Sequence, residues 1–129
     1  MRALIVAASL LGLLLVAAGA AGAHTVPIDA GPRWQSAILY GFVHALAAAV
    51  SAILPFRSRL QIVAGWCFVA AVVLFSGVQI GKIMLAGTGS GPTPLDNLGM
   101  LVPAGGVAFI AGWLMMGLSA ATAGSRRED

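Results

Sequence analysis

Apolar residues fill four long stretches of the chain, and polar residues gather in the short segments between them. The stretches do not alternate apolar and polar positions as transmembrane β-strands do, so helices are the expected spanning form. About 20 apolar residues are enough to cross the hydrocarbon core as a helix. The pattern therefore predicts four transmembrane helices, over residues 3–23, 34–54, 60–85 and 98–121.

The connecting segments are short and polar, and they read HTVPIDAGPR (24–33), PFRSR (55–59) and GTGSGPTPLDN (87–97). Glycine and proline mark such segments as loops or turns. The short PFRSR turn makes the second and third helices an antiparallel hairpin. We therefore expect an all-α integral membrane four-helix bundle, antiparallel and up-down-up-down, as one domain over residues 1–121 with a polar tail over 122–129.

Composition agrees with a membrane protein. Hydrophobic residues make up 60% of the chain and charged residues only 9%, whereas a soluble domain of this size would carry far more charge. The net charge of +3 comes from basic residues at segment ends, which form no patch for nucleic acid. The single cysteine, Cys67, excludes a disulfide framework and a cysteine-based metal site.

Basic residues also predict orientation, because cytoplasmic loops are enriched in lysine and arginine. With four alternating helices, two basic residues face one side, and five face the other: Arg2, Arg57, Arg59, Arg126 and Arg127. This bias predicts both termini in the cytoplasm of a bacterial inner membrane.

The first segment has a second interpretation. One arginine, an apolar centre and small residues at the end are also typical of a signal peptide. Cleavage after Ala23 would leave three helices and make His24 the amino terminus, where its amine and ring could chelate copper. Whether residues 1–23 are removed stays open at this point.

An ionisable residue lies near the middle of the second helix. His44 follows Tyr40 by four positions, so both lie on one helical face. Such residues usually face the bundle interior and find a partner. A proton relay, a quinone headgroup contact or haem ligation would use it chemically, although the other histidine, His24, lies about 15 Å away in depth. The simpler hypothesis is a neutral imidazole that bonds across helices to Ser76 or Gln79.

A group of polar residues is expected at the outer face. His24, Asp29 and Asp96 could gather there and hold a divalent metal in principle. They come from two separate loops with no ligand spacing, so we predict no metal site. His24 more simply caps the last turn of the first helix.

Small residues are expected at helix contacts, since close approach drives helix association in lipid. The candidates are Gly77, Gly81, Gly105, Gly106 and Gly112, of which the first two form a GxxxG pair. Packing within one protomer is the simpler role, and a dimer seam is the alternative. Two tryptophans, Trp66 and Trp113, lie deep in their helices, where an indole N–H needs an acceptor.

Catalytic motifs are missing from the sequence. All four acidic residues lie outside the predicted helices, and there is no G-x-S-x-G, P-loop, CxxC or H-E-x-x-H. We therefore expect no enzymatic activity and no cofactor.

Four stretches carry a family resemblance: GAAGAH (19–24), WQSAILYGFVHAL (34–46), AGWCFVAAVVLFSG (64–77) and VPAGGVAFIAGWLMM (102–116). In this order they resemble the small membrane proteins called domain of unknown function 423, a group to which eukaryotic transmembrane protein 256 is similar. The resemblance implies a retained first helix, which lowers the weight of signal cleavage. It implies an architecture and no activity.

The function expected from these observations is structural. A chain of this size without catalytic motifs is best interpreted as an accessory or scaffold subunit that packs, in the lipid bilayer, against a membrane-protein partner or further copies of itself. The alternative is a small transporter, channel or quinone- or lipid-binding protein that uses His44 and Tyr40.

Overall fold

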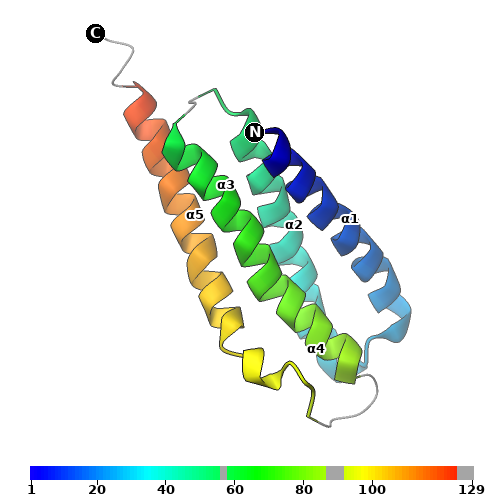
Figure 1. The fold of residues 1–129 in the computed structure, drawn as a ribbon. Helices are drawn as coiled ribbons and strands as arrows, with labels where there is room; N and C mark the ends of the chain where they lie inside the picture. Colours follow the sequence, from blue (N-terminus) through cyan, green and yellow to red (C-terminus); the bar gives the residue numbers. More distant parts are fainter. Residues whose placement is uncertain (56–57, 87–91, 125–129) are drawn as a thin grey trace.

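The computed structural model describes residues 1–55, 58–86 and 92–124 (Figure 1). Three arginines of the orientation argument, Arg57, Arg126 and Arg127, lie outside the described residues. The described elements are α1 (Arg2–Thr25), the 3-10 helix η1 (Ile28–Ala30), α2 (Gly31–Ile53), α3 (Arg59–Val72), the π-helix η2 (Val73–Gly77), α4 (Val78–Ala86), the 3-10 helix η3 (Asp96–Leu98) and α5 (Leu101–Gly124).

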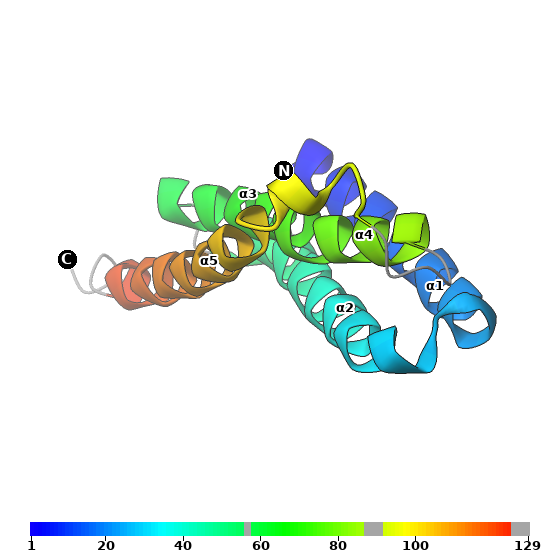
Figure 2. The ribbon, with the colours of Figure 1, turned by 90° about the horizontal axis from the view of Figure 1, so that it is seen from below.

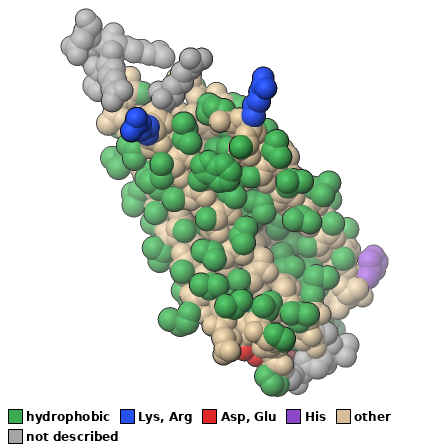
Figure 3. Space-filling model, in the orientation of Figure 1, with side chains coloured by type: hydrophobic (Ala, Val, Ile, Leu, Met, Phe, Trp, Pro, Cys, Tyr) green, Lys and Arg blue, Asp and Glu red, His purple; other side chains and the backbone are tan. Residues whose placement is uncertain are grey.

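Four helical segments of the described chain are long and apolar enough to cross a membrane: Arg2–Thr25, Ile28–Ile53, Arg59–Ala86 and Asp96–Ala123. The third segment joins α3, η2 and α4 in one run. Hydrophobic side chains cover most of the visible face, with basic side chains at its upper end and acidic ones at its lower end (Figure 3). The predicted class, an all-α membrane bundle, is confirmed.

The central pair of the bundle is α2 and α3. Helix α1 packs mainly on α2, and α5 packs on α3 and η2 (Figures 1 and 2). Consecutive membrane segments run in alternating directions, so the start of α1 and the end of α5 lie at the same end of the molecule (Figure 1). Helices α1 and α5 form opposite flanks of the bundle, because they pack on different members of the central pair.

Local sequence explains where the helices begin and end. Helices α1 and α2 each end one residue before an X-Pro step, since proline disfavours helical backbone in the residue before it. Pro32 lies in the first turn of α2, where its missing N–H is not needed. Ser58 caps α3 by accepting a hydrogen bond from the backbone N–H of Gln61 at 3.1 Å.

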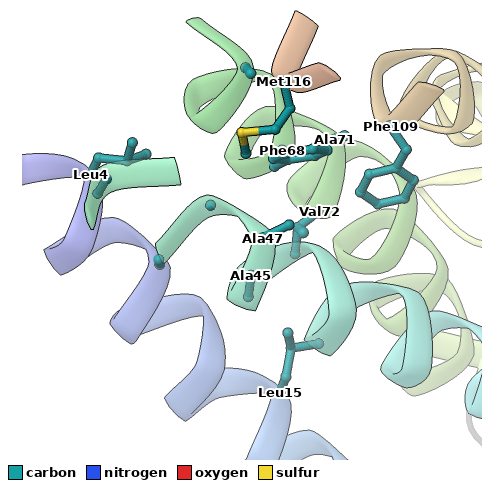
Figure 4. Packing of buried hydrophobic residues seen from close by; sticks show 13 residues of the cluster. Leu4, Leu15, Ala45, Ala47, Phe68, Ala71, Val72, Phe109 and Met116 are labelled. Carbon is teal, nitrogen blue, oxygen red and sulfur yellow. The ribbon is translucent and has the colours of Figure 1, made fainter. Parts of the chain in front are cut away.

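The buried core combines alanine with a few large side chains (Figure 4). Helix α2 contributes alanines at four positions, which allow α1 and α3 to approach closely. The larger members come from the other three membrane segments: Leu4, Leu15, Phe68, Val72, Phe109 and Met116. The core is therefore continuous across the bundle.

Two of the predicted packing glycines lie at close helix contacts. A Cβ added to Gly105 would lie 2.7 Å from the backbone nitrogen of Phe75, and one added to Gly112 would lie 2.5 Å from the Phe68 ring. A larger residue would require the backbone of Phe75 to shift at Gly105, or the Phe68 ring to shift at Gly112. Helix α5 thus approaches α3 and η2 through its glycines.

The other three predicted glycines behave differently. A Cβ at Gly81 would lie 2.9 Å from Leu95, in the segment before η3. A Cβ at Gly106 would meet nothing within 4 Å, and one at Gly77 only the carbonyl oxygen of Val72 in its own segment. The prediction that Gly77 and Gly106 pack against a neighbouring helix of the protomer is therefore wrong.

Glycines that the sequence analysis did not select fill this role on α1, α2 and α3. Gly22 lies under the Trp34 ring, Gly41 against Leu15, and Gly65 against Ser51 and Leu4 of two different helices. The identity of each neighbour depends on how the helices are arranged, which the sequence pattern of one helix does not contain.

Candidate functional site

His44 lies in the middle of α2 among aromatic rings from three membrane segments. It is 5% exposed, and its ring stacks on Phe109 of α5 with centroids 3.6 Å apart. Phe68 of α3 and Trp113 of α5 lie at 5.7 and 6.1 Å, and Tyr40 lies one turn earlier on α2 at 6.0 Å. The imidazole therefore faces the bundle interior, as is usual for such a residue.

Both nitrogens of His44 are hydrogen-bonded within the protein. The indole N–H of Trp113 donates to Nε2 at 3.1 Å, and Nδ1 lies 2.7 Å from the backbone carbonyl oxygen of Tyr40. An indole N–H can only donate and a carbonyl can only accept, so the ring is neutral with its hydrogen on Nδ1. Trp113 thereby obtains the acceptor that its depth requires.

The predicted partner of His44 was wrong. Ser76 donates its hydroxyl to the carbonyl oxygen of Ala37 at 2.6 Å, and Gln79 lies half-buried on α4. The partner is Trp113 on α5, which lies close enough to α2 for aromatic side chains to meet between them. The four predicted residues Tyr40, His44, Ser76 and Gln79 therefore do not form one polar site.

This arrangement limits what His44 can do chemically. The Nε2 lone pair accepts from Trp113, so it cannot ligate haem iron while that bond is made. A proton added at Nε2 would place two N–H groups against each other. The geometry joins α2 to α5, and in this arrangement both ring nitrogens are engaged in hydrogen bonds within the protein.

The edge of the aromatic cluster reaches the molecular surface. Tyr40 is 47% exposed and Trp113 is 50% exposed, although both lie beside the buried imidazole. Tyr40 packs on Phe75 at 5.3 Å and on Phe109 at 6.2 Å. A molecule in the membrane would therefore meet these two rings and not His44 itself.

A second polar cluster lies where α2 ends and α3 begins, and the sequence analysis did not select it. Gln61 is fully buried, and its Nε2 donates to the carbonyl oxygens of Ser51 at 2.5 Å and Leu54 at 2.8 Å. Its Oε1 has no hydrogen-bond partner among the described residues. The hydroxyls of Ser58 and Ser119 bond to each other, which ties α5 to this turn.

A signal for this cluster was present in the sequence. Ser58 and Gln61 have the S-x-x-Q spacing of a helix capping box. In that motif the glutamine side chain reaches back to the cap residue. Here it extends instead to the free carbonyls at the end of α2 and satisfies them.

The predicted outer-face cluster does not assemble. No group of three histidine, cysteine, aspartate or glutamate side chains within residues 1–55, 58–86 and 92–124 could hold a metal ion. Asp96 instead forms an ion pair with Lys82 at 3.1 Å and accepts from the backbone N–H of Thr93 at 2.7 Å. His24 lies in the last turn of α1 and Asp29 in η1.

Comparison with known proteins identifies the family. The profile of the family described as "Protein of unknown function (DUF423)" matches residues 18–106, from the end of α1 to the first turns of α5. The chain belongs to the DUF423 family. The match includes Tyr40, His44 and Gln61 but ends before Trp113.

Curated relatives of this DUF423 chain are bacterial membrane proteins. UPF0382 membrane protein YwdK of Bacillus subtilis is 34% identical over 93% of this chain and 97% of its own length. UPF0382 membrane protein SH2409 of Staphylococcus haemolyticus is 31% identical over 92% and 95%, respectively. UPF0382 membrane protein SAB0533 of Staphylococcus aureus is 28% identical over 90% and 93%. No solved structure matches the chain.

Proposed function

We propose that this DUF423 protein is a non-catalytic accessory or scaffold subunit of an assembly in the bacterial inner membrane, with both termini in the cytoplasm. The observation that carries the proposal is the internal use of both His44 nitrogens by Trp113 and the Tyr40 backbone. His44, the mid-membrane residue best suited to proton transfer or metal binding, thus serves to join two helices.

The arrangement of the helices supports this role. Helices α1 and α5 lie on opposite flanks of the α2–α3 pair, and most of their large apolar side chains are exposed (Figure 2). In a bilayer these flanks contact lipid or another membrane protein. A subunit with two such flanks can contact two partners at once, or copies of itself.

A second candidate function rests on the exposed edge of the aromatic cluster. Tyr40 and Trp113, each about half exposed, form a surface where a quinone or lipid headgroup could stack. On this hypothesis His44 is a positioning residue for Trp113. A small transporter or channel that uses His44 would need Tyr40 and Trp113 to move apart, so that a substrate could reach the imidazole.

Purification in a gentle detergent followed by native mass spectrometry separates the two functions. A stoichiometric protein partner, or a defined homo-oligomer, supports the scaffold role, and a retained quinone supports the second candidate. His44→Ala should lower thermal stability and partner retention together. Tyr40→Phe is the matched control, because it keeps the ring contacts and removes only the hydroxyl.

Membrane orientation is tested separately. With Cys67 replaced by alanine, single cysteines at Arg2 and Thr122 should react with a membrane-impermeant maleimide only after the cells are lysed. A cysteine at Asp29 should react in intact spheroplasts. Labelling of Arg2→Cys and Thr122→Cys from opposite sides would overturn the proposed topology.

A further inference from the structure

An apolar groove of about 560 Å³ runs between α1 and the segment formed by η2 and α4. It is separate from the His44 cluster, which lies between α2, α3 and α5. One wall comes from α1, between Leu11 and Ala21, and the other from the third membrane segment, between Val72 and Met84.

Small residues keep the groove open. Ala17, Ala18 and Ala21 line one wall, and Ser76 and Gly77 line the other. In lipid such residues usually bring helices into contact, as Gly105 does. At Gly77, however, an added Cβ would meet only its own segment, at 3.9 Å. Here the small side chains leave space where they could have closed it.

The lining offers nothing polar to a ligand. Ser76 is the only lining residue with a polar side chain, and its hydroxyl is already donated to the carbonyl oxygen of Ala37 at 2.6 Å. An apolar space of this kind does not hold water. The occupant must therefore be hydrocarbon over the whole groove.

The groove also has a defined depth in the membrane. From Leu11 to Ala21 it follows α1 for about 15 Å, from the middle of the helix toward its η1 end. On the opposite wall it runs from Val72, in the middle of the third membrane segment, to Met84 near its end. It therefore spans one leaflet, the one that contains η1.

We propose that the groove binds one hydrocarbon chain of a lipid in the leaflet that contains η1. Its volume lies within the range of small-molecule sites, about 300–1,000 Å³. The groove is about 15 Å long, which matches one leaflet of a hydrocarbon core about 30 Å thick, whereas a transmembrane helix of another protein would cross both leaflets. A flexible acyl or isoprenoid chain fills the space without help from polar groups. This proposal is independent of the scaffold role.

Gly77→Leu is the decisive variant. A Cβ added at Gly77 would have no contact shorter than 3.9 Å, and because Gly77 lines the groove, a leucine there should extend into it. Gly106→Leu is the matched control, because Gly106 is equally open but lies on α5 outside the groove. Both variants are expected to fold, and circular dichroism in detergent checks this. Ala18→Leu fills the groove from the other wall and serves if Gly77→Leu does not fold.

The probe is a phosphatidylcholine with a diazirine in one acyl chain, added to phosphatidylethanolamine and phosphatidylglycerol vesicles that contain the protein. After illumination, adducts are located by peptide mass spectrometry. Adducts on the half-buried groove residues Ala18 and Ile80 should exceed those on the exposed Leu13 and Val16 at least threefold. Gly77→Leu should remove this excess, and Gly106→Leu should preserve it.

Three results would overturn the proposal. The first is equal labelling of groove and exposed residues in the unchanged protein. The second is an excess that persists in both groove-filling variants. The third is a disulfide-linked dimer through Ala18→Cys in a Cys67→Ala background, which would show that a second copy covers the groove.

Discussion

Trp113 on α5 donates its indole N–H to Nε2 of His44 on α2 at 3.1 Å, and this bond joins two membrane helices that are far apart in the sequence. The donor is half exposed and the acceptor is buried. The bond fixes the imidazole tautomer and gives the histidine a structural task in the middle of the bundle.

A double-mutant cycle on this pair should show coupling. His44→Ala, Trp113→Phe and the combined variant are unfolded reversibly in mixed micelles. Interhelical hydrogen bonds in membrane proteins average about 0.6 kcal/mol and reach about 1.7 kcal/mol, so the coupling should fall in that range. Strictly additive losses would show that the bond does not contribute to stability.

Neighbouring glycines on α5 should respond in opposite directions to alanine. Gly105→Ala places a Cβ against the backbone of Phe75, which cannot move aside, and should destabilise by about 1–3 kcal/mol. Gly106→Ala meets open space and should be neutral or stabilising by up to about 1 kcal/mol, because alanine favours helix. The measurement is the free energy of unfolding of both variants. Equal effects would contradict the packing of α5 on η2.

Gln61 should tolerate methionine better than glutamate. Methionine leaves the carbonyls of Ser51 and Leu54 without a donor, at a cost of about 1–3 kcal/mol, but it also removes the unpaired Oε1. Glutamate keeps the shape, but at neutral pH it must either bury a negative charge beside those carbonyls or take up a proton, and both cost free energy, so Gln61→Glu should lose more. Thermal melts of the two variants give the order, and the reverse order would show that a donor reaches Oε1.

Helix α1 should remain in the mature protein. Leu4, Ala8 and Leu15 are buried against the other helices, and Leu4 contacts the position of Gly65. Loss of residues 1–23 would expose this part of the core and remove one wall of the lipid groove. Intact mass spectrometry of the protein purified from its membrane decides the matter. A mass that corresponds to a chain starting at His24 would support the signal-peptide interpretation.

The number and type of the membrane helices could be predicted because length and apolar content are local properties of the sequence. The neighbours of each residue could not. The general rule that ionisable side chains face the interior of a membrane bundle placed His44 correctly, but it could not show that α5 lies close enough for Trp113 to reach the ring. The Ser76 hydroxyl, which was proposed as the partner of His44, donates instead to the backbone carbonyl oxygen of Ala37.

The π-helix changes the direction in which the GxxxG pair points. The wider turn of η2 breaks the 3.6-residue periodicity between α3 and α4, so a face predicted from regular spacing along the whole segment is rotated after Val73. Gly77 then lines the groove, and Gly81 contacts Leu95. Nothing in the composition of Val73–Gly77 distinguishes it from the α-helical residues on either side.

The π-helix η2 is also the one described place in the third membrane segment where a residue can be deleted with little loss of stability. A π-turn holds one residue more than an α-turn, so deletion of Leu74 would yield a continuous α-helix with both flanking faces still aligned. The same deletion within α3 would rotate every later residue by about 100° and carry Lys82 away from Asp96. Sequence gaps in relatives of this protein should therefore concentrate between Val73 and Gly77.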